Sequence, residues 1–171
     1  MMKKLYIIRH AKAQRDNPNG DFGRDLCKRG EDDIKEMSIR LKNRKIKPDA
    51  FVSSAALRTA RTARLLAKAF SFDEKKIVFE KKLYEADENK LFEYIKRCDD
   101  KYNELCIIGH NPALRELCEL LSTIYLSSFP TSSVFALEFE VESFADIKAH
   151  SGKLVFFECI KKLKDGAVSE I

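Results

Sequence analysis

Short apolar runs alternate with longer amphipathic stretches along most of the chain. Four apolar runs predict β-strands, at Leu5–Ile8, Ala50–Val52, Ile77–Phe79 and Leu105–Ile108. Apolar residues at helical spacing predict helices over Glu31–Arg44, from Ser53 or Ser54 to Ala69, over Asn89–Arg97, and from Asn111 to about Leu121. Strands that alternate with helices in this way are typical of a mostly parallel sheet covered by helices on both faces.

Local residue preferences predict where two of these helices begin. Serine is a preferred helix cap, so Ser53 or Ser54 is expected to cap the second helix. Asn111 is expected to cap the fourth helix, with Pro112 at its first helical position. Further along, Val134–Glu140 and Leu154–Ile160 predict two more strands that form an antiparallel edge. The expected fold is therefore α/β with three layers (α/β/α).

Composition is consistent with a folded globular protein. The chain has 171 residues, of which 44% are hydrophobic and 35% charged, so we expect one domain over residues 1–171. The net charge of +5 favours anionic partners, but the charges are too dispersed to indicate nucleic-acid binding. No apolar run approaches the roughly 18 residues of a membrane span. The first apolar run is also shorter than the core of a signal peptide, so a cytoplasmic protein is expected.

The cysteines do not indicate a metal or redox site. Their number is odd and they are scattered, at Cys27, Cys98, Cys106, Cys118 and Cys159. No pair has Cys-x-x-Cys spacing, and the sequence has no cluster of histidines or dense set of carboxylates. We therefore expect buried, reduced thiols, and neither a metal nor a cofactor.

Two of the three histidines directly follow predicted strands. Arg9 and His10 come after Leu5–Ile8, and His110 comes after Leu105–Ile108. In open α/β sheets, ligands bind at the carboxyl ends of the strands. Both histidines are therefore expected at the edge of the sheet where a ligand binds.

Two further charged residues are expected at the same edge. Arg58 lies in the first turns of the helix after the second strand, and Glu85 follows the third strand. Taken alone, each has a structural explanation, and Arg61 and Arg64 on the same helix are expected to be solvated charges. The arrival of four separate segments at one edge is what indicates a site.

These residue types suit phosphoryl transfer. Guanidinium groups bind phosphate oxygens in a bidentate manner, and a neutral imidazole can act as the nucleophile and carry the phosphoryl group. A second, protonated imidazole would neutralise charge in the transition state, and a carboxylic acid would protonate the leaving atom. The helix that begins after Asn111 would add free N–H groups to the same anion site.

The motifs around these residues resemble those of the histidine phosphatase superfamily, which is also called phosphoglycerate mutase-like. The similarity is carried by Arg9-His10-Ala11, by Ser53-Ser54 with Arg58-Thr59, and by Gly109-His110-Asn111-Pro112. Within this superfamily the chain is most similar to the small SixA-type phosphohistidine phosphatases. That similarity rests on Asp21-Phe-Gly-Arg24-Asp-Leu26 with Arg29-Gly30, on Leu83-Tyr84-Glu85-Ala86, and on Phe129-Pro130-Thr131.

The resemblance implies a role for each candidate residue. It makes His10 the phosphorylated nucleophile and Glu85 the candidate proton donor. The other members of the phosphate pocket would be Arg9, Arg58 and His110, and the residues expected beside the pocket, in contact with substrate, are Asp21, Arg24 and Asn111.

The substrate stays open at this level. The segment between Arg58 and His110 is short, so little chain is left to form a cap over the pocket. An open pocket suits phosphohistidine or another phosphorylated side chain in a protein, and it also suits small phosphomonoesters. A third possibility is a module that binds phosphate without turnover, although pure binding would not require a nucleophile.

Overall fold

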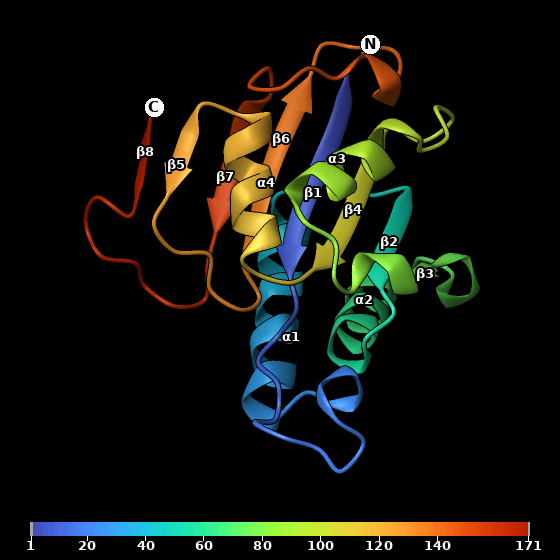
Figure 1. Ribbon diagram of the computed structural model, residues 1–171, viewed down its shortest axis with the longest axis vertical. Helices are drawn as coiled ribbons and strands as arrows, with labels where there is room; N and C mark the ends of the chain where they lie inside the picture. The colour runs from blue at the N-terminus through green and yellow to red at the C-terminus, as the bar shows by residue number, and fades with distance from the viewer. Residues whose placement is uncertain (1, 171) are drawn as a thin grey trace.

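A six-stranded sheet forms the centre of the protein (Figure 1). The computed structural model describes residues 2–170. The strand order is β3-β2-β4-β1-β6-β7, with bounds β1 Lys3–Arg9, β2 Ala50–Ser54, β3 Val78–Glu80, β4 Glu104–Gly109, β6 Val134–Phe139 and β7 Lys153–Glu158. The first four strands along the chain are parallel, whereas β6 and β7 are antiparallel additions at one side. The prediction of a mostly parallel sheet with an antiparallel edge is confirmed.

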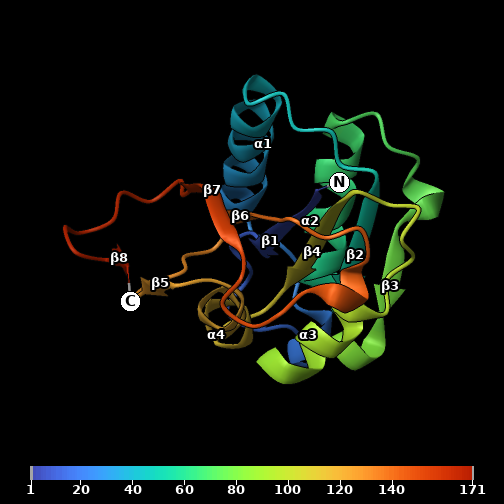
Figure 2. The ribbon, with the colours of Figure 1, turned by 90° about the horizontal axis from the view of Figure 1, so that it is seen from above.

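Helices cover both faces of this sheet. Their bounds are α1 Lys28–Asn43, α2 Leu57–Ala69, α3 Glu88–Lys96 and α4 Ala113–Leu121. Figure 2 shows α1 on one side of the sheet and α3 and α4 on the other. The buried side chains form two clusters, one shared by the sheet with α1 and α2 and the other shared with α3 and α4. These two cores confirm the three-layer α/β/α architecture.

Strand β1 explains how the sequence specifies this layering. Leu5 and Ile7 face the core under α3 and α4, while Tyr6 and Ile8 face the core under α1 and α2. All four residues are at most 2% exposed, so both faces of the strand are buried. A strand segment buried on both faces is apolar without alternation, which is the pattern of Leu5–Ile8 at the centre of β1.

Two predicted helix starts are wrong. Ser53 and Ser54 are the last residues of β2 and cap nothing, because α2 begins only at Leu57 with Ala56 in the cap position. Helix α4 begins at Ala113, so Pro112 takes the cap position instead of the first helical position. The Asn111 side chain nevertheless accepts a hydrogen bond from the backbone N–H of Arg115, at 3.3 Å.

A second, two-stranded sheet was not predicted. It pairs β5 (Ile124–Leu126) with β8 (Val168–Glu170) in antiparallel fashion. Three residues are too few to show an alternating pattern, so the sequence carried no signal for either strand. Within residues 2–170, no helix is long and apolar enough to cross a membrane.

Candidate active site

The parallel pairing of β1 with β4 brings the two strand-end histidines together. Arg9 pairs with Gly109 in the sheet register, so the next residues, His10 and His110, leave adjacent strands at the same level. Figure 1 shows the two arrowheads ending side by side. The ring centres of His10 and His110 are 5.5 Å apart. Two imidazoles from distant parts of the sequence therefore face one small volume.

Hydrogen bonding determines the tautomer of His10. Its Nδ1 lies 2.7 Å from the backbone oxygen of Ala11. A carbonyl oxygen only accepts, so Nδ1 carries the proton and Nε2 carries the lone pair. His10 is 7% exposed, and this burial, opposed by the Ala11 hydrogen bond and reinforced by His110 and the arginines, lowers its pKa to about 3. The ring is therefore neutral at pH 7, as a nitrogen nucleophile must be.

His110 is held by a serine hydroxyl. Its Nε2 lies 2.8 Å from Oγ of Ser54, which also accepts the Ala56 N–H at 3.3 Å. The Ser54 hydroxyl can donate to Nε2 or accept from it; we assign the tautomer in which it donates, so that the proton of the neutral ring lies on Nδ1, which has no partner in the described chain. Burial, with the positive charge of Arg58, lowers the pKa of His110 to about 4. The sequence predicted that His110 would be protonated. In the protein without substrate its ring is instead neutral, and Nδ1 offers one N–H donor.

Several buried donors around the histidines lack a partner. Among the atoms of residues 2–170, no group accepts from Nε of Arg9, Nε of Arg58 or Nδ1 of His110, all of which are buried. The proximity of the two arginines is evident in the pKa of Arg9, which burial and the charge of Arg58 both lower. Buried donors are almost always paired in folded proteins. A set of unpaired, mostly cationic donors is complementary to an anion with several oxygens.

Asp21 links the loop after β1 to this donor set. It lies in a short 3-10 turn, η1 (Asp21–Gly23), and its carboxylate accepts from Nη2 of Arg58 at 3.1 Å and from Nη1 of Arg24 at 2.9 Å. The Tyr84 hydroxyl also donates to it. These hydrogen bonds, that of Tyr84 first, hold the pKa of Asp21 well below its usual value. Asp21 and Arg24 therefore lie beside Arg58, as the resemblance implied.

Asn111 positions the arginine on β1. Its Nδ2 donates to the backbone oxygen of Phe129 at 2.9 Å, and Nη1 of Arg9 donates to the same oxygen at 3.0 Å. Both polar ends of the Asn111 side chain are thus engaged within the protein. Asn111 was predicted to contact substrate, whereas here its side chain bonds to the backbone of Phe129 and Arg115, next to Arg9.

Glu85 is the candidate that the structure does not connect to the others. Its side chain is exposed, and no hydrogen bond or ion pair to it is found in residues 2–170.

The other two arginines of α2 are engaged elsewhere. Arg61 forms ion pairs with Asp25 and Glu31, and Arg64 forms an ion pair with Glu74. Arg58 alone among the three arginines of α2 meets Asp21.

Tyr84 and Ser54 are site residues that sequence reasoning missed. Tyr84 stands next to Glu85, and its ring meets that of His110 edge to face at 5.5 Å between centres. Ser54 was interpreted as a helix cap. The adjacent serines Ser53 and Ser54 are visible in the sequence. Which of the two hydroxyls meets His110 depends on where β2 ends, and that is not visible.

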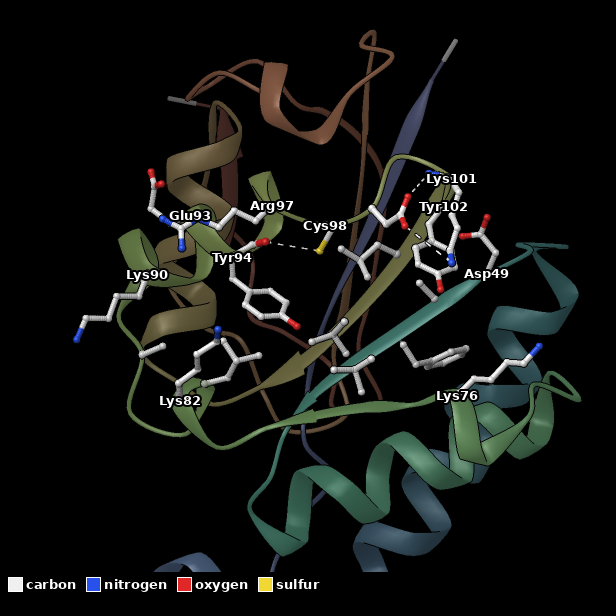
Figure 3. Close-up of a pocket in the computed structure, with 18 of the residues that line it drawn as sticks. Asp49, Lys76, Lys82, Lys90, Glu93, Tyr94, Arg97, Cys98, Lys101 and Tyr102 are labelled. Atoms are coloured by element: carbon white, nitrogen blue, oxygen red, sulfur yellow. Dashed lines mark hydrogen bonds and ion pairs between the residues drawn. The ribbon is translucent and has the colours of Figure 1, made fainter.

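A separate cavity lies away from His10 and His110. It has a volume of about 1120 Å³ and lies between α3 and the β2–β3 edge of the sheet (Figure 3). Tyr94 reaches from α3 into it, while Lys82 and Arg97 lie around it. Its lining contains none of the predicted site residues, although it includes Leu83 and Ala86, which flank Tyr84 and Glu85 in the sequence. Over residues 2–170, no group of three or more His, Cys, Asp or Glu side chains is placed to hold a metal ion.

Comparison with known proteins gives one family. The model of the histidine phosphatase superfamily (branch 1) matches residues 5–105. The chain is similar in structure to a SixA protein from Agrobacterium tumefaciens, with 26% identity and a TM-score of 0.76 over 92% of this chain and 97% of that one. No curated protein sequence gives a significant match.

More distant structures share the fold. The protein histidine phosphatase SixA complexed with tungstate has a TM-score of 0.78 at 19% identity, over 90% of this chain and 95% of that one. A mycobacterial glucosyl-3-phosphoglycerate phosphatase has a TM-score of 0.66 at 13% identity, over 90% and 98%. At these identities the likeness establishes the architecture alone.

Proposed function

Because this chain belongs to the histidine phosphatase superfamily (branch 1), we propose that it is a cytoplasmic phosphatase that transfers a phosphoryl group through His10. The observation that carries the proposal is the neutral His10 ring, with its lone pair on Nε2, next to buried donors that have no partner in the described chain. The donors would bind the phosphoryl oxygens, and Nε2 would attack phosphorus. A phosphate-binding module would need the donors but not a neutral imidazole among them.

The reaction has two displacements. In the first, a bond forms between Nε2 of His10 and phosphorus while the bond to the leaving atom breaks, and that atom keeps the electron pair. In the second, water attacks the phosphorus of phospho-His10, and the P–N pair returns to Nε2 as inorganic phosphate forms. Arg9, Arg58 and the Nδ1–H of His110 would stabilise the oxygens in both transition states. No step requires a metal, so we expect full activity in the presence of a chelator.

The substrate that we propose is phosphohistidine, or another phosphorylated side chain, in a protein. Support comes from the similarity to the SixA protein and from the short segment between α2 and β4, which provides little chain to cover the site. Small phosphomonoesters are the second candidate, supported by the fold shared with a glucosyl-3-phosphoglycerate phosphatase.

The test combines a nucleophile variant with a substrate panel. His10→Ala should fold normally and lose nearly all turnover, while wild-type reactions quenched in base should contain an acid-labile, base-stable phosphoenzyme. His150→Ala is the matched control, because this third histidine bonds to Ser122 through its Nδ1, at 3.0 Å. Substantial activity in His10→Ala would contradict the proposal. Comparing phosphohistidine proteins with phosphometabolites separates the two substrate classes.

A further inference from the structure

Two aromatic side chains stand at the rim of the candidate site. The rings of Phe22, on η1, and Tyr84 meet edge to face with centres 4.9 Å apart. Tyr84 also contacts the ring of His110, and the guanidinium carbon of Arg58 lies 5.9 Å from the Tyr84 ring centre. Phe22 and Tyr84 are half-buried, whereas His10 and Arg58 are buried. The aromatic pair therefore lies between the donor set and solvent.

A carboxylate accompanies the aromatic pair. Asp21 accepts hydrogen bonds from Tyr84, Arg58 and Arg24, yet its side chain is still 51% exposed, so it can accept a further hydrogen bond on its outer side. A negative charge at this place repels phosphate oxygens, so it disfavours the anionic part of a substrate. It favours a positively charged group on the outer side of the site.

The direction of the reaction places the leaving group at this rim. In an in-line displacement the leaving atom lies opposite the nucleophile across phosphorus. His10 is buried whereas Phe22 and Tyr84 are half-buried, so the aromatic pair lies on the solvent side of the site, where we place the leaving group. The outward groups next to His110 and Arg58 are Tyr84 and its partners Phe22 and Asp21.

We infer that Phe22, Tyr84 and Asp21 form a subsite for the leaving group, and that this subsite selects a protonated imidazole ring. The inference rests on the proposed function and identifies what would distinguish phosphohistidine from other substrates. Aromatic rings attract a planar cation, and a carboxylate accepts a strong hydrogen bond from a charged N–H. An alkyl leaving group would gain neither contact.

The chemical step balances without an added proton. A phosphohistidine ring that is protonated on the nitrogen not bonded to phosphorus is a cation. As Nε2 of His10 bonds to phosphorus, the substrate P–N bond breaks and its electron pair stays on the substrate nitrogen. The ring leaves as neutral imidazole and keeps its N–H, which Asp21 accepts as a hydrogen bond throughout. The leaving ring therefore needs no proton from Glu85.

The test compares phosphohistidine with phosphoramidate, which has the same P–N bond and no ring. Tyr84→Leu should lower kcat/KM for phosphohistidine by about 10-fold, the scale of a desolvated cation–aromatic contact, and change phosphoramidate turnover by less than about 2-fold. Tyr84→Phe keeps the ring and should retain the preference. Tyr125→Leu is the matched control, because Tyr125 is 44% exposed on β5.

The outcomes separate this inference from the proposed function. If Tyr84→Leu lowers both substrates equally, or neither, the subsite does not exist as described. If the wild type hydrolyses neither substrate, the phosphatase proposal itself fails. Phe22→Leu alters the second ring and gives the same comparison if Tyr84→Leu does not fold, with equal effects on both substrates again overturning the inference.

Discussion

Acidification should destabilise this protein through its two buried site histidines. The pKa values of His10 and His110 in the folded state are about 3 and about 4, while an imidazole in an unfolded chain titrates near 6.5. Below pH 6.5 the unfolded state therefore binds more protons than the folded state. The free energy of unfolding must then fall as the pH decreases, down to the folded pKa values.

The size of the loss in unfolding free energy follows from the pH range over which only the unfolded chain binds protons. Between pH 7 and pH 5 both rings stay neutral in the folded protein, while almost all unfolded chains become protonated. Each histidine then contributes a loss of roughly 2 kcal/mol, and the pair together about 3–4 kcal/mol. This is a large part of the usual 5–15 kcal/mol of a folded domain. Asp21 acts in a different window, because its lowered pKa contributes stability that is lost only below about pH 4.

Urea unfolding at pH 7, 6 and 5 measures this loss. The double variant His10→Asn with His110→Asn should show a much weaker dependence on pH than the wild type, because amides do not titrate. Two results would refute the reasoning: a wild-type unfolding free energy that is equal at pH 7 and pH 5, or a double variant with the full wild-type dependence. Either would mean that the rings are not held neutral by burial.

Three further changes test separate parts of the structure. Arg58→Lys should lower kcat/KM by about 10²-fold or more, since a point charge cannot replace a fork of donors, whereas Arg61→Ala should retain activity; equal losses would indicate a diffuse basic surface. Glu85→Gln should slow alkyl phosphomonoesters by about 10²–10⁴-fold and barely affect p-nitrophenyl phosphate, and a uniform loss would exclude a role as acid. Gly30→Ala should lower the free energy of unfolding by about 2 kcal/mol or more in denaturant titration, because its Cβ would lie 2.0 Å from the backbone oxygen of Lys12; an unchanged midpoint would contradict this close contact.

Much of the fold could be predicted because burial is visible in the sequence. The uninterrupted apolar residues of β1 and β4 indicated strands covered on both faces, and their ends located His10 and His110. The first residues of the helices were harder to predict from the sequence. Ser54 has the side chain of a cap but continues β2, because its hydroxyl turns to His110 and its backbone stays in the sheet.

The candidate site was only partly predictable for a related reason. Charged residues that closely follow a strand stand out in a sequence, so Arg9 at the end of β1 and Arg58 at the start of α2 could be picked out as candidates. Contacts between loops leave no such pattern. The bond from Tyr84 to Asp21 joins residues 63 positions apart, and it depends on how η1 folds back over α2. The protonation states of the histidines also depend on burial, which single residues do not reveal.

The position of β1 has a consequence for how the protein is made. This strand is synthesised before both of its neighbours in the sheet, β4, which ends at Gly109, and β6, which ends at Phe139. The apolar residues of β1 therefore lack sheet partners until β4 and β6 have been synthesised, and long-range pairing of this kind slows folding. Since Arg9 and His10 are positioned by these two neighbours, an incomplete chain that stops before β6 cannot assemble the donor set. We therefore expect a chain that ends before β6 to lack the proposed phosphate-binding site as well as the complete sheet.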